Sequence, residues 1–367
     1  MLPALFRHTP AVFAVNREYQ IFVPVSAPAV MWVRVGRTDY YDDSNGILRS
    51  DTDLHRMRVP MEELDAAEKY TVCWRTVTDR KPYYPVLEPV REAEFAFRPV
   101  KNAPVRAYMI ADAHGMLEPC VEAARRFSEQ AGGPDLLILN GDILNHSGDA
   151  ANFDLYYQLA QELTGGQIPV IVSRGNHDLR GKCAERLTEY LPGDGGNTFY
   201  SFRLGPVWGL LLDCAEDKND ACDEYGGTIC CHAFRRRQSA YLEQIVARAD
   251  REYAAPGVEY RIVLSHIPFT ERFSAPFNIE EELYAGWVRR LNETVRPHLL
   301  LSGHIHAAYL TLPGQEKDAY GMNFPTVVGS RVNKKEGVFA GCGVIFGGGS
   351  VRILFTDADR VLADMTL

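Results

Sequence analysis

Histidine, aspartate and asparagine side chains follow five of six short apolar runs in the later part of the sequence. The runs are RAYMIA, DLLILN, IPVIVS, VWGLLLD, YRIVLS and HLLLS. The residues that follow five of these runs are Asp112 and His114 in DAH, Asp142 in GD, Asn176, His177 and Asp178 in RGNHD, then His266, and finally His304 and His306 in GHIH. Imidazole and carboxylate groups bind metal ions and transfer protons. A lone histidine or Gly-Asp turn is commonly structural, but five such sites in order predict one reactive centre.

The apolar runs are typical of strands that are buried on both faces of a sheet. Amphipathic segments between them, PCVEAARRFSEQ, FDLYYQLAQEL and RRQSAYLEQIVARADREY, predict helices, and together the two patterns indicate an α/β layout. Functional groups of such folds gather at the carboxyl ends of the strands. Residues two apart in an extended chain point the same way, so we expect each of the pairs Asp112/His114 and His304/His306 to face one place.

Two aspartates, one asparagine and four histidines form a mixed nitrogen and oxygen ligand set. Such a set suits Zn, Mn or Fe better than Ca or Mg. Seven ligands are too many for one catalytic ion with an open position, and they suffice for two ions that share a carboxylate. We therefore predict two divalent or mixed-valence transition-metal ions, whose identity the sequence leaves open.

The ordered series D-x-H, G-D, G-N-H-D, H and G-H-x-H resembles the motif set of the calcineurin-like metallophosphoesterases, over residues 104–367. The resemblance implies an α/β fold, a metallophosphatase β-sandwich flanked by helices in four layers (αββα). It assigns one ion to Asp112, His114, Asp142 and His306. It assigns the other ion to Asp142, Asn176, His266 and His304, with Asp142 bridging.

This resemblance implies a metal-dependent phosphoric ester hydrolase, either a phosphatase or a phosphodiesterase. Two ions about 3.5–4 Å apart clamp the attacking and leaving oxygens and acidify a water between them. By resemblance His177 is not a ligand but faces the substrate, as a general acid or as a stabiliser of phosphoryl charge. Asp178 either orients a neighbouring imidazole or caps a helix.

Two positions depart from the relatives. Purple acid phosphatases carry an iron-binding tyrosine three residues after the G-D aspartate, where this chain has Asn145, so no tyrosinate-ferric chromophore is expected. Protein phosphatases carry a phosphate-binding arginine four residues after it, where this chain has His146. Histidine is a weaker anion clamp than arginine, and His146 is either a substrate contact or a loop residue. Monoesters and diesters both remain open as substrates.

The first hundred residues show a different pattern. YQIFVPV, AVMWVRVG, HRMRVPM, YTVCWRTV and EAEFAFRPV alternate in part with period two and are separated by polar turns. Leu64 lies six residues before Tyr70, which shares a strand face with Val72 and Trp74, as in the tyrosine corner of a fibronectin-III-like module. We predict a small all-β sandwich at 1–100, loosely similar in placement to that of purple acid phosphatases, and a metallophosphoesterase domain at 104–367. An unrelated small β domain is the alternative.

Composition restricts the partners and the compartment. The net charge of −9 and the lack of a basic stripe make nucleic acid an unfavourable partner, whereas a small phosphorylated substrate is compatible with bound metal. No apolar run has the length of a membrane span, and the N-terminus lacks the pattern of a signal peptide. Together with eight dispersed cysteines, this predicts a cytoplasmic protein.

The loop Cys214–His232 contains four cysteines, either as free thiols or in a zinc site or disulfide. Arg235, Arg236 and Arg237 are interpreted as a solvated helix start.

Two other functions compete with the enzyme. The chain could be a non-catalytic metal-binding scaffold or interaction protein on the same fold, which a missing ligand would favour, and none is missing. Alternatively, the N-terminal sandwich could act as a protein- or glycan-binding module.

The end of the sequence is again rich in strand signals. From FPTVVGS onward the pattern predicts further strands and a hairpin around Asp357–Arg360.

Overall fold

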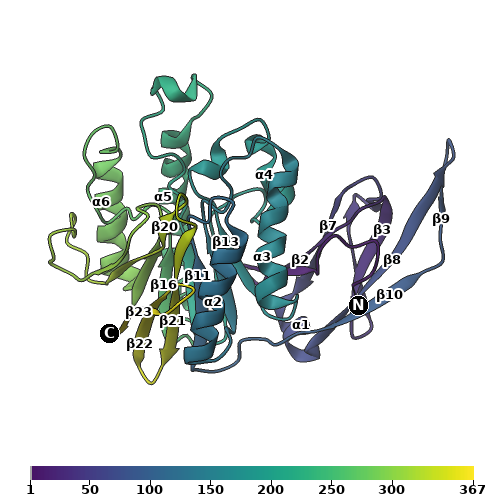
Figure 1. Ribbon diagram of the computed structural model, residues 1–367, viewed down its shortest axis with the longest axis horizontal. Coiled ribbons are helices and arrows are strands. Elements are labelled where there is room, and N and C mark those ends of the chain that lie inside the picture. Colours follow the sequence, from purple (N-terminus) through teal and green to yellow (C-terminus); the bar gives the residue numbers. More distant parts are fainter. Residues whose placement is uncertain (1) are drawn as a thin grey trace.

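A ten-stranded sheet extends through the whole molecule, in a computed structural model that describes residues 2–367 (Figure 1). Its strand order is β23 (Val361–Thr366), β22 (Ser350–Thr356), β21 (Val338–Gly347), β11 (Val105–Ile110), β12 (Leu136–Asn140), β13 (Val170–Ser173), β1 (Ala11–Val15), β2 (Glu18–Pro24) and β7 (Leu54–Pro60). Strand β20 (Arg331–Asn333) pairs with β21. The tail strands and the turn between Asp357 and Arg360 confirm the predicted β-rich end.

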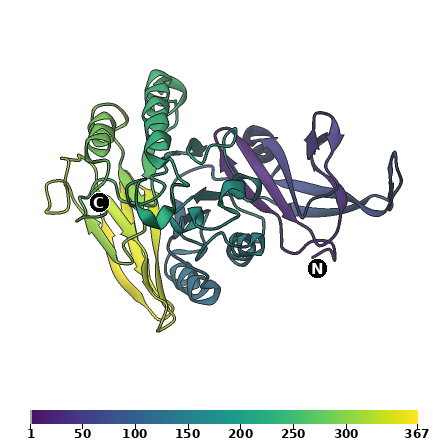
Figure 2. The same cartoon turned by 90° about the horizontal axis from the view of Figure 1, so that it is seen from above.

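A six-stranded sheet lies against one part of this large sheet. Its order is β14 (Tyr200–Leu204), β15 (Val207–Leu211), β16 (Tyr260–Leu264), β17 (Leu299–Ser302), β19 (Thr326–Gly329) and β18 (Ala308–Thr311). Helices α2 (Leu117–Ala131) and α3 (Asp154–Thr164) cover the ten-stranded sheet, and α5 (Cys231–Ala247) and α6 (Glu281–Arg290) cover the six-stranded sheet (Figures 1 and 2). The layers are therefore helix, sheet, sheet, helix, as predicted.

The six predicted apolar runs form β11, β12, β13, β15, β16 and β17. All six are buried along their length apart from one partly exposed position in each of β11 and β16, because helices cover one face of each sheet and the other sheet covers the opposite face. Within each sheet the pairs β11–β12, β12–β13, β15–β16 and β16–β17 are parallel. Their carboxyl ends consequently lie on one edge of each sheet, and this edge positions the polar residues that follow.

The N-terminal strands belong to two larger sheets and to the short two-stranded sheet of β5 (Asp43–Ser44) and β6 (Ile47–Leu48). Strands β3 (Ala29–Val35), β4 (Thr38–Tyr41), β8 (Lys69–Arg80), β9 (Pro85–Leu87) and β10 (Arg91–Ala96) form a separate five-stranded sheet. Strands β1, β2 and β7 instead extend the large sheet, where β1 pairs in parallel with β13 through Phe13 and Val170. The fibronectin-like fold of residues 1–100 stays a prediction, but both the sheet and the apolar core continue across the predicted boundary.

Tyr70 shows the same continuity at the level of one side chain. It is buried with Val72 and Trp74, as the shared strand face predicts. Its hydroxyl, however, donates a hydrogen bond of 2.8 Å to the carbonyl oxygen of Gly166, in the loop after α3. A tyrosine corner would bond within its own module. Here the hydroxyl of Tyr70 joins the two predicted domains.

The remaining short α-helices are α1 (Met61–Ala67) and α4 (Leu187–Tyr190).

Candidate metal centre

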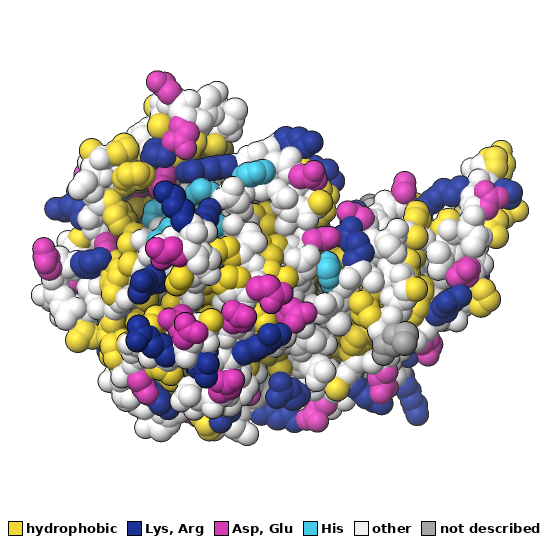
Figure 3. Space-filling model, in the orientation of Figure 1, with side chains coloured by type: hydrophobic (Ala, Val, Ile, Leu, Met, Phe, Trp, Pro, Cys, Tyr) yellow, Lys and Arg dark blue, Asp and Glu magenta, His cyan; other side chains and the backbone are white. Residues whose placement is uncertain are grey.

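The loops after five of the parallel strands bring the seven predicted ligand side chains together. Asp112 and His114 follow β11, Asp142 follows β12, Asn176 follows β13, His266 follows β16, and His304 and His306 follow β17. The first three strands belong to the large sheet and the last two to the six-stranded sheet. Figure 3 shows histidine side chains gathered on one part of the surface, with lysine or arginine side chains beside them. The site therefore lies where the two sheets present their carboxyl ends.

The backbone of these loops is left-handed at most of the predicted ligands. The φ angles are +55° at Asp112, +45° at His114, +51° at Asp142, +71° at His304 and +55° at His306. Non-glycine residues rarely adopt this conformation, and such strain concentrates at functional sites. The expectation that each pair lies on an extended chain is therefore wrong. The pairs lie in tight loops beyond the strand ends, and the loops rather than strand alternation aim the side chains.

Glycines in the motifs allow the loops to approach one another. A Cβ atom on Gly175 would lie 2.1 Å from Oδ1 of Asp142. A Cβ atom on Gly141, which has a φ of +82°, would lie 2.6 Å from the ring of His266. Neither position can hold a larger residue unless a predicted ligand moves.

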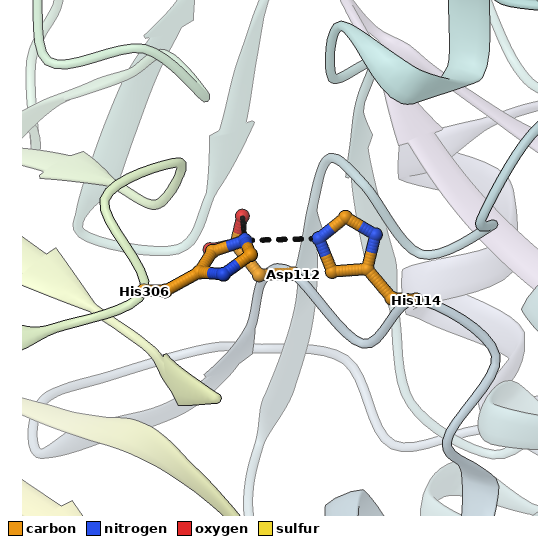
Figure 4. Close-up of side chains that lie close together, drawn as sticks. All are labelled: Asp112, His114 and His306. Atoms are coloured by element: carbon orange, nitrogen blue, oxygen red, sulfur yellow. Dashed lines mark hydrogen bonds and ion pairs between the residues drawn. The ribbon is translucent and has the colours of Figure 1, made fainter. Parts of the chain in front are cut away.

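The first group of side chains is Asp112, His114 and His306 (Figure 4). The Nε2 atoms of His114 and His306 lie 2.9 Å apart, and Nε2 of His306 lies 3.4 Å from Oδ1 of Asp112. Asp112 and His114 are buried, while His306 is exposed on one side. The ligand atoms of all three residues lie within 4.8 Å of one another, as one ion requires.

The second group is Asp142, His266 and His304, and Asn176 adjoins it. Nε2 of His266 lies 3.3 Å from Oδ2 of Asp142, and Nδ1 of His304 lies 3.0 Å from the amide oxygen of Asn176. A further grouping joins Asp142 to His114 and His177. Asp142 thus lies between the two groups, which is the position of a bridging carboxylate.

Two observations show that this site fits cations. Nε2 of His266 is buried without a hydrogen-bond partner among the described residues, although Nδ1 of the same ring donates to the carbonyl of Asn140 at 2.8 Å. The amide oxygen of Asn176 faces other acceptors, and only a reversed amide would donate to Nδ1 of His304 and Oδ2 of Asp142. The converging acceptors, with the carboxylate of Asp142 beside both groups, favour a positive charge at this place, which a metal ion or the proton on His266 supplies. The donor set therefore fits a pair of metal ions.

The protein groups alone already create a strong electrostatic field. Burial lowers the pKa of His266, but the carboxylates of Asp142 and Asp112 outweigh burial and raise it to about 10. Burial raises the pKa of Asp142, yet His266 and other nearby histidines hold it well below its usual range. Burial lowers the pKa of His114 to about 4, and burial together with the charge of His266 lowers that of His304 to about 4. Neutral imidazoles of this kind are the form that binds metal.

Asp178 supports the loops rather than an imidazole. Its Oδ2 accepts hydrogen bonds from the backbone amides of Asp142 at 3.1 Å and Gly175 at 2.8 Å and from the hydroxyl of Tyr156 at 3.1 Å. Burial and the charge of Asp142 raise its pKa to about 7. These contacts differ from both predicted roles, because no partner is a histidine and Asp178 lies inside the 3-10 turn His177–Leu179 rather than at its N-cap. No signal in the sequence indicated this role, because the two backbone amides that donate to Asp178 belong to other segments or have no side-chain signal.

His177 and His146 lie beside the two groups. The ring nitrogen Nδ1 of His177 donates to the carbonyl of Asn145 at 3.0 Å, and its Nε2 lies 4.0 Å from Oδ2 of Asp142. Its side chain is 29% exposed, so a substrate can reach it. His146 is exposed and its Nδ1 accepts from the amide of Gly148 at 3.0 Å, within its own loop. Contact of either histidine with substrate stays a prediction.

Three residues near the centre had no signal in the sequence. Ser330 donates a hydrogen bond to Oδ2 of Asp112. Arg180 pairs with Glu216 through two hydrogen bonds of 2.9 Å. Lys334 donates to the amide oxygen of Asn145 at 2.7 Å. Their spacing matches no motif, because each reaches the site from a separate loop.

The cysteine-rich loop contains free thiols at Cys214, Cys222, Cys230 and Cys231. The ring of His232 pairs with Glu280 at 2.7 Å.

Arg235 corrects the interpretation of a solvated helix start. It is 1% exposed and donates to the carbonyls of Cys214 at 2.7 Å and Glu216 at 2.5 Å, and it pairs with Glu280 at 2.9 Å. Only its neighbours Arg236 and Arg237 are exposed. An arginine can be buried where its donors all find acceptors, and here it holds the start of the cysteine-rich loop against α5.

Comparison with known proteins identifies the class. The calcineurin-like phosphoesterase family model matches residues 105–308, and the chain belongs to this family. Among solved structures, a purple acid phosphatase from yellow lupin (Lupinus luteus) seeds shares 12% identity over 99% of this chain and 75% of its own, with a TM-score of 0.61. A predicted phosphoesterase from Streptococcus pneumoniae shares 12% identity over 72% of this chain and 98% of its own, with a TM-score of 0.34. No curated protein sequence matches the chain.

The chain is accordingly a metal-dependent phosphoesterase, and the family implies a dinuclear divalent metal centre. Within residues 2–367, we find no helix with the length and apolar character needed to cross a membrane.

Proposed function

We propose that the protein hydrolyses a small phosphomonoester or phosphodiester at the site formed by the two ligand groups. The observation that carries the proposal is the convergence of the seven predicted ligands, with Asp142 between their two groups and with Nε2 of His266 buried without a hydrogen bond among the described residues. Asp112, His114, Asp142 and His306 would hold one ion, and Asp142, Asn176, His266 and His304 the other. When bound, the two ions supply an acidified water as the nucleophile and neutralise phosphoryl charge.

His177 is the proposed general acid or phosphate stabiliser. A carbonyl oxygen can only accept, so the contact with Asn145 fixes the proton of His177 on Nδ1. Nε2 then faces the region next to Asp142, where a second proton on the ring can pass to the leaving oxygen. The backbone amide of His177 also donates to Oδ1 of Asp142 at 2.8 Å, and this bond fixes the position of the shared carboxylate relative to the histidine.

The proposed substrate is a small phosphorylated molecule rather than nucleic acid or a membrane. A net charge of −9 opposes non-specific binding to phosphate backbones. All eight cysteines are free thiols, which favours a reducing compartment, and we propose the cytoplasm.

Metal analysis combined with parallel assays tests the function. The protein is stripped with a chelator and reloaded with Mn, Zn, Fe or Ni, and bound metal is counted. Turnover of nitrophenyl phosphate and bis-nitrophenyl phosphate is then measured for each loaded form. We expect two ions per chain and activity that disappears with chelation and returns with metal. Two filled sites without turnover under any metal would refute the proposal.

A further inference from the structure

Most cations around the metal centre are already paired with carboxylates. The pairs are Arg180 with Glu216 at 2.9 Å, Arg174 with Asp213 at 2.7 Å and Lys218 with Glu224 at 2.6 Å. A cation that is paired in this way has little charge left for a phosphate group, because the carboxylate competes for the same donors.

Lys334 differs from these cations. It lies in the turn that joins β20 to β21, and within the described part of the chain it forms no ion pair with a carboxylate. Its ammonium group donates to the neutral amide oxygen of Asn145 at 2.7 Å. Partial desolvation of the ammonium lowers the pKa of Lys334, and the carboxylates of Asp142 and Asp112 oppose that shift. The ammonium is thus held by a neutral acceptor, on the residue whose backbone oxygen also holds His177 beside Asp142.

Asn145 places Lys334 beside His177. The side-chain oxygen of Asn145 accepts from Lys334, and its backbone oxygen accepts from Nδ1 of His177. Both donors are therefore positioned by one residue, on the side of Asp142 where His177 faces the site. His146, at the position of the phosphate-binding arginine of protein phosphatases, instead bonds within its own loop.

We propose that Lys334 binds a non-bridging phosphoryl oxygen of the substrate and makes the site prefer a dianionic phosphomonoester over a monoanionic diester. The inference rests on the proposed function and deepens it by naming the substrate class. A lysine side chain has a flexible four-carbon stem, so Nζ can move from Asn145 to a phosphoryl oxygen. A monoester has two negative charges near neutral pH and a diester has one, so the attraction to an additional ammonium is greater for the monoester.

The test compares Lys334→Met with Lys335→Met in the full-length, metal-loaded protein. Lys335 is the matched control, since it is the next residue in the same turn and is also exposed. We expect Lys334→Met to lower kcat/KM for nitrophenyl phosphate by about tenfold and for bis-nitrophenyl phosphate by at most about threefold. We expect Lys334→Arg to restore most of the loss and Lys335→Met to leave both values unchanged.

Binding of inorganic phosphate, measured by calorimetry, separates this inference from the proposed function. We expect Lys334→Met to weaken phosphate binding about tenfold at unchanged metal content, and Lys335→Met to leave it unchanged. If the wild type turns over neither ester, the proposed function fails and phosphate affinity alone decides the role of Lys334. Equal affinity of both variants, an equal loss on both esters, or loss of metal from Lys334→Met would each overturn the inference.

Discussion

At the scale of single residues, backbone carbonyls decide which ring nitrogen of a histidine faces the centre. Nδ1 of His266 donates to Asn140, and Nδ1 of His177 donates to Asn145. In both rings Nε2 therefore points toward the carboxylate of Asp142. A hydrogen bond from Nδ1 to a carbonyl oxygen fixes the tautomer and the orientation of the ring, so Nε2 is placed to act as a ligand or as an acid.

The first prediction concerns His177. Replacing it with alanine should leave both metals bound, because its ring lies outside the two proposed ligand sets. Hydrolysis of an alkyl phosphate should slow by about a hundredfold or more, since a poor leaving group needs a proton. Nitrophenyl phosphate leaves without one and should be affected less. Steady-state kinetics on both esters measures this, with His232→Ala as the control. Equal losses on the two esters would remove the general-acid role.

The second prediction separates the two metal sites. His306→Ala should weaken mainly the ion held by Asp112 and His114, and His304→Ala mainly the ion held by Asn176 and His266. Each loss should exceed about tenfold in affinity, since a direct ligand matters at least as much as the residues that orient it. Metal content after dialysis against graded metal concentrations measures both sites. The assignment fails if the two variants lose the same ion.

At the scale of elements, parallel strands bring the loops to one edge and the loops complete the geometry. Five of the seven predicted ligands have positive φ angles, so their side chains leave the chain in directions that a strand does not allow. Glycines next to the ligands permit the close approach of neighbouring loops. Asp178 then holds two of these loops together through the backbone amides of Asp142 and Gly175.

The third prediction tests this close approach. Gly175→Ala places a Cβ atom 2.1 Å from Oδ1 of Asp142, so the shared carboxylate must move. We expect metal affinity to fall by about tenfold or more and activity to fall with it. Gly133→Ala is the control, because a Cβ atom there meets nothing within 4 Å. Calorimetric titration with Mn measures the effect. Unchanged affinity in Gly175→Ala would show that the loops have room.

At the scale of the whole molecule, one sheet joins both predicted domains. Strand β1 is the neighbour of β13, and a single apolar core includes residues from before and after position 100. Tyr70 and the backbone contact from Asn16 to Ser201, at 2.7 Å, add polar links across the same boundary. The N-terminal strands therefore protect an edge of the sheet that contains the ligand loops.

The fourth prediction follows from that continuity. The segment 104–367, expressed alone, should expose the edge of β13 and the apolar surface that β1 and β2 cover. Exposed edges and apolar patches promote aggregation, so we expect this segment to be aggregated or to lack cooperative unfolding. Size-exclusion chromatography and thermal unfolding measure this, with the full chain as the control. A monomeric, fully active segment would show that the first hundred residues form an independent module.

Several features were predictable from the sequence because their signals are local. Continuous apolar runs predicted the buried parallel strands, and helical periodicity predicted α2, α3 and α5. The order and chemical types of the motif residues predicted the family and the donor set. Each of these signals lies within a few consecutive residues, where hydrophobic period and side-chain chemistry act directly.

Contacts between distant segments were decided by the tertiary structure alone. The left-handed loops, the burial of Arg235 and the role of Asp178 depend on neighbours that the local pattern does not contain. Lys334 reaches Asn145 across 189 positions of the chain, and β1 pairs with β13 across the predicted domain boundary. The sequence by itself therefore determined the chemistry that the centre contains. Packing determined which of these side chains lie close together, that Lys334 has no carboxylate partner among the described residues, and that one sheet crosses the predicted boundary, because these depend on distances between segments that only the folded chain brings together.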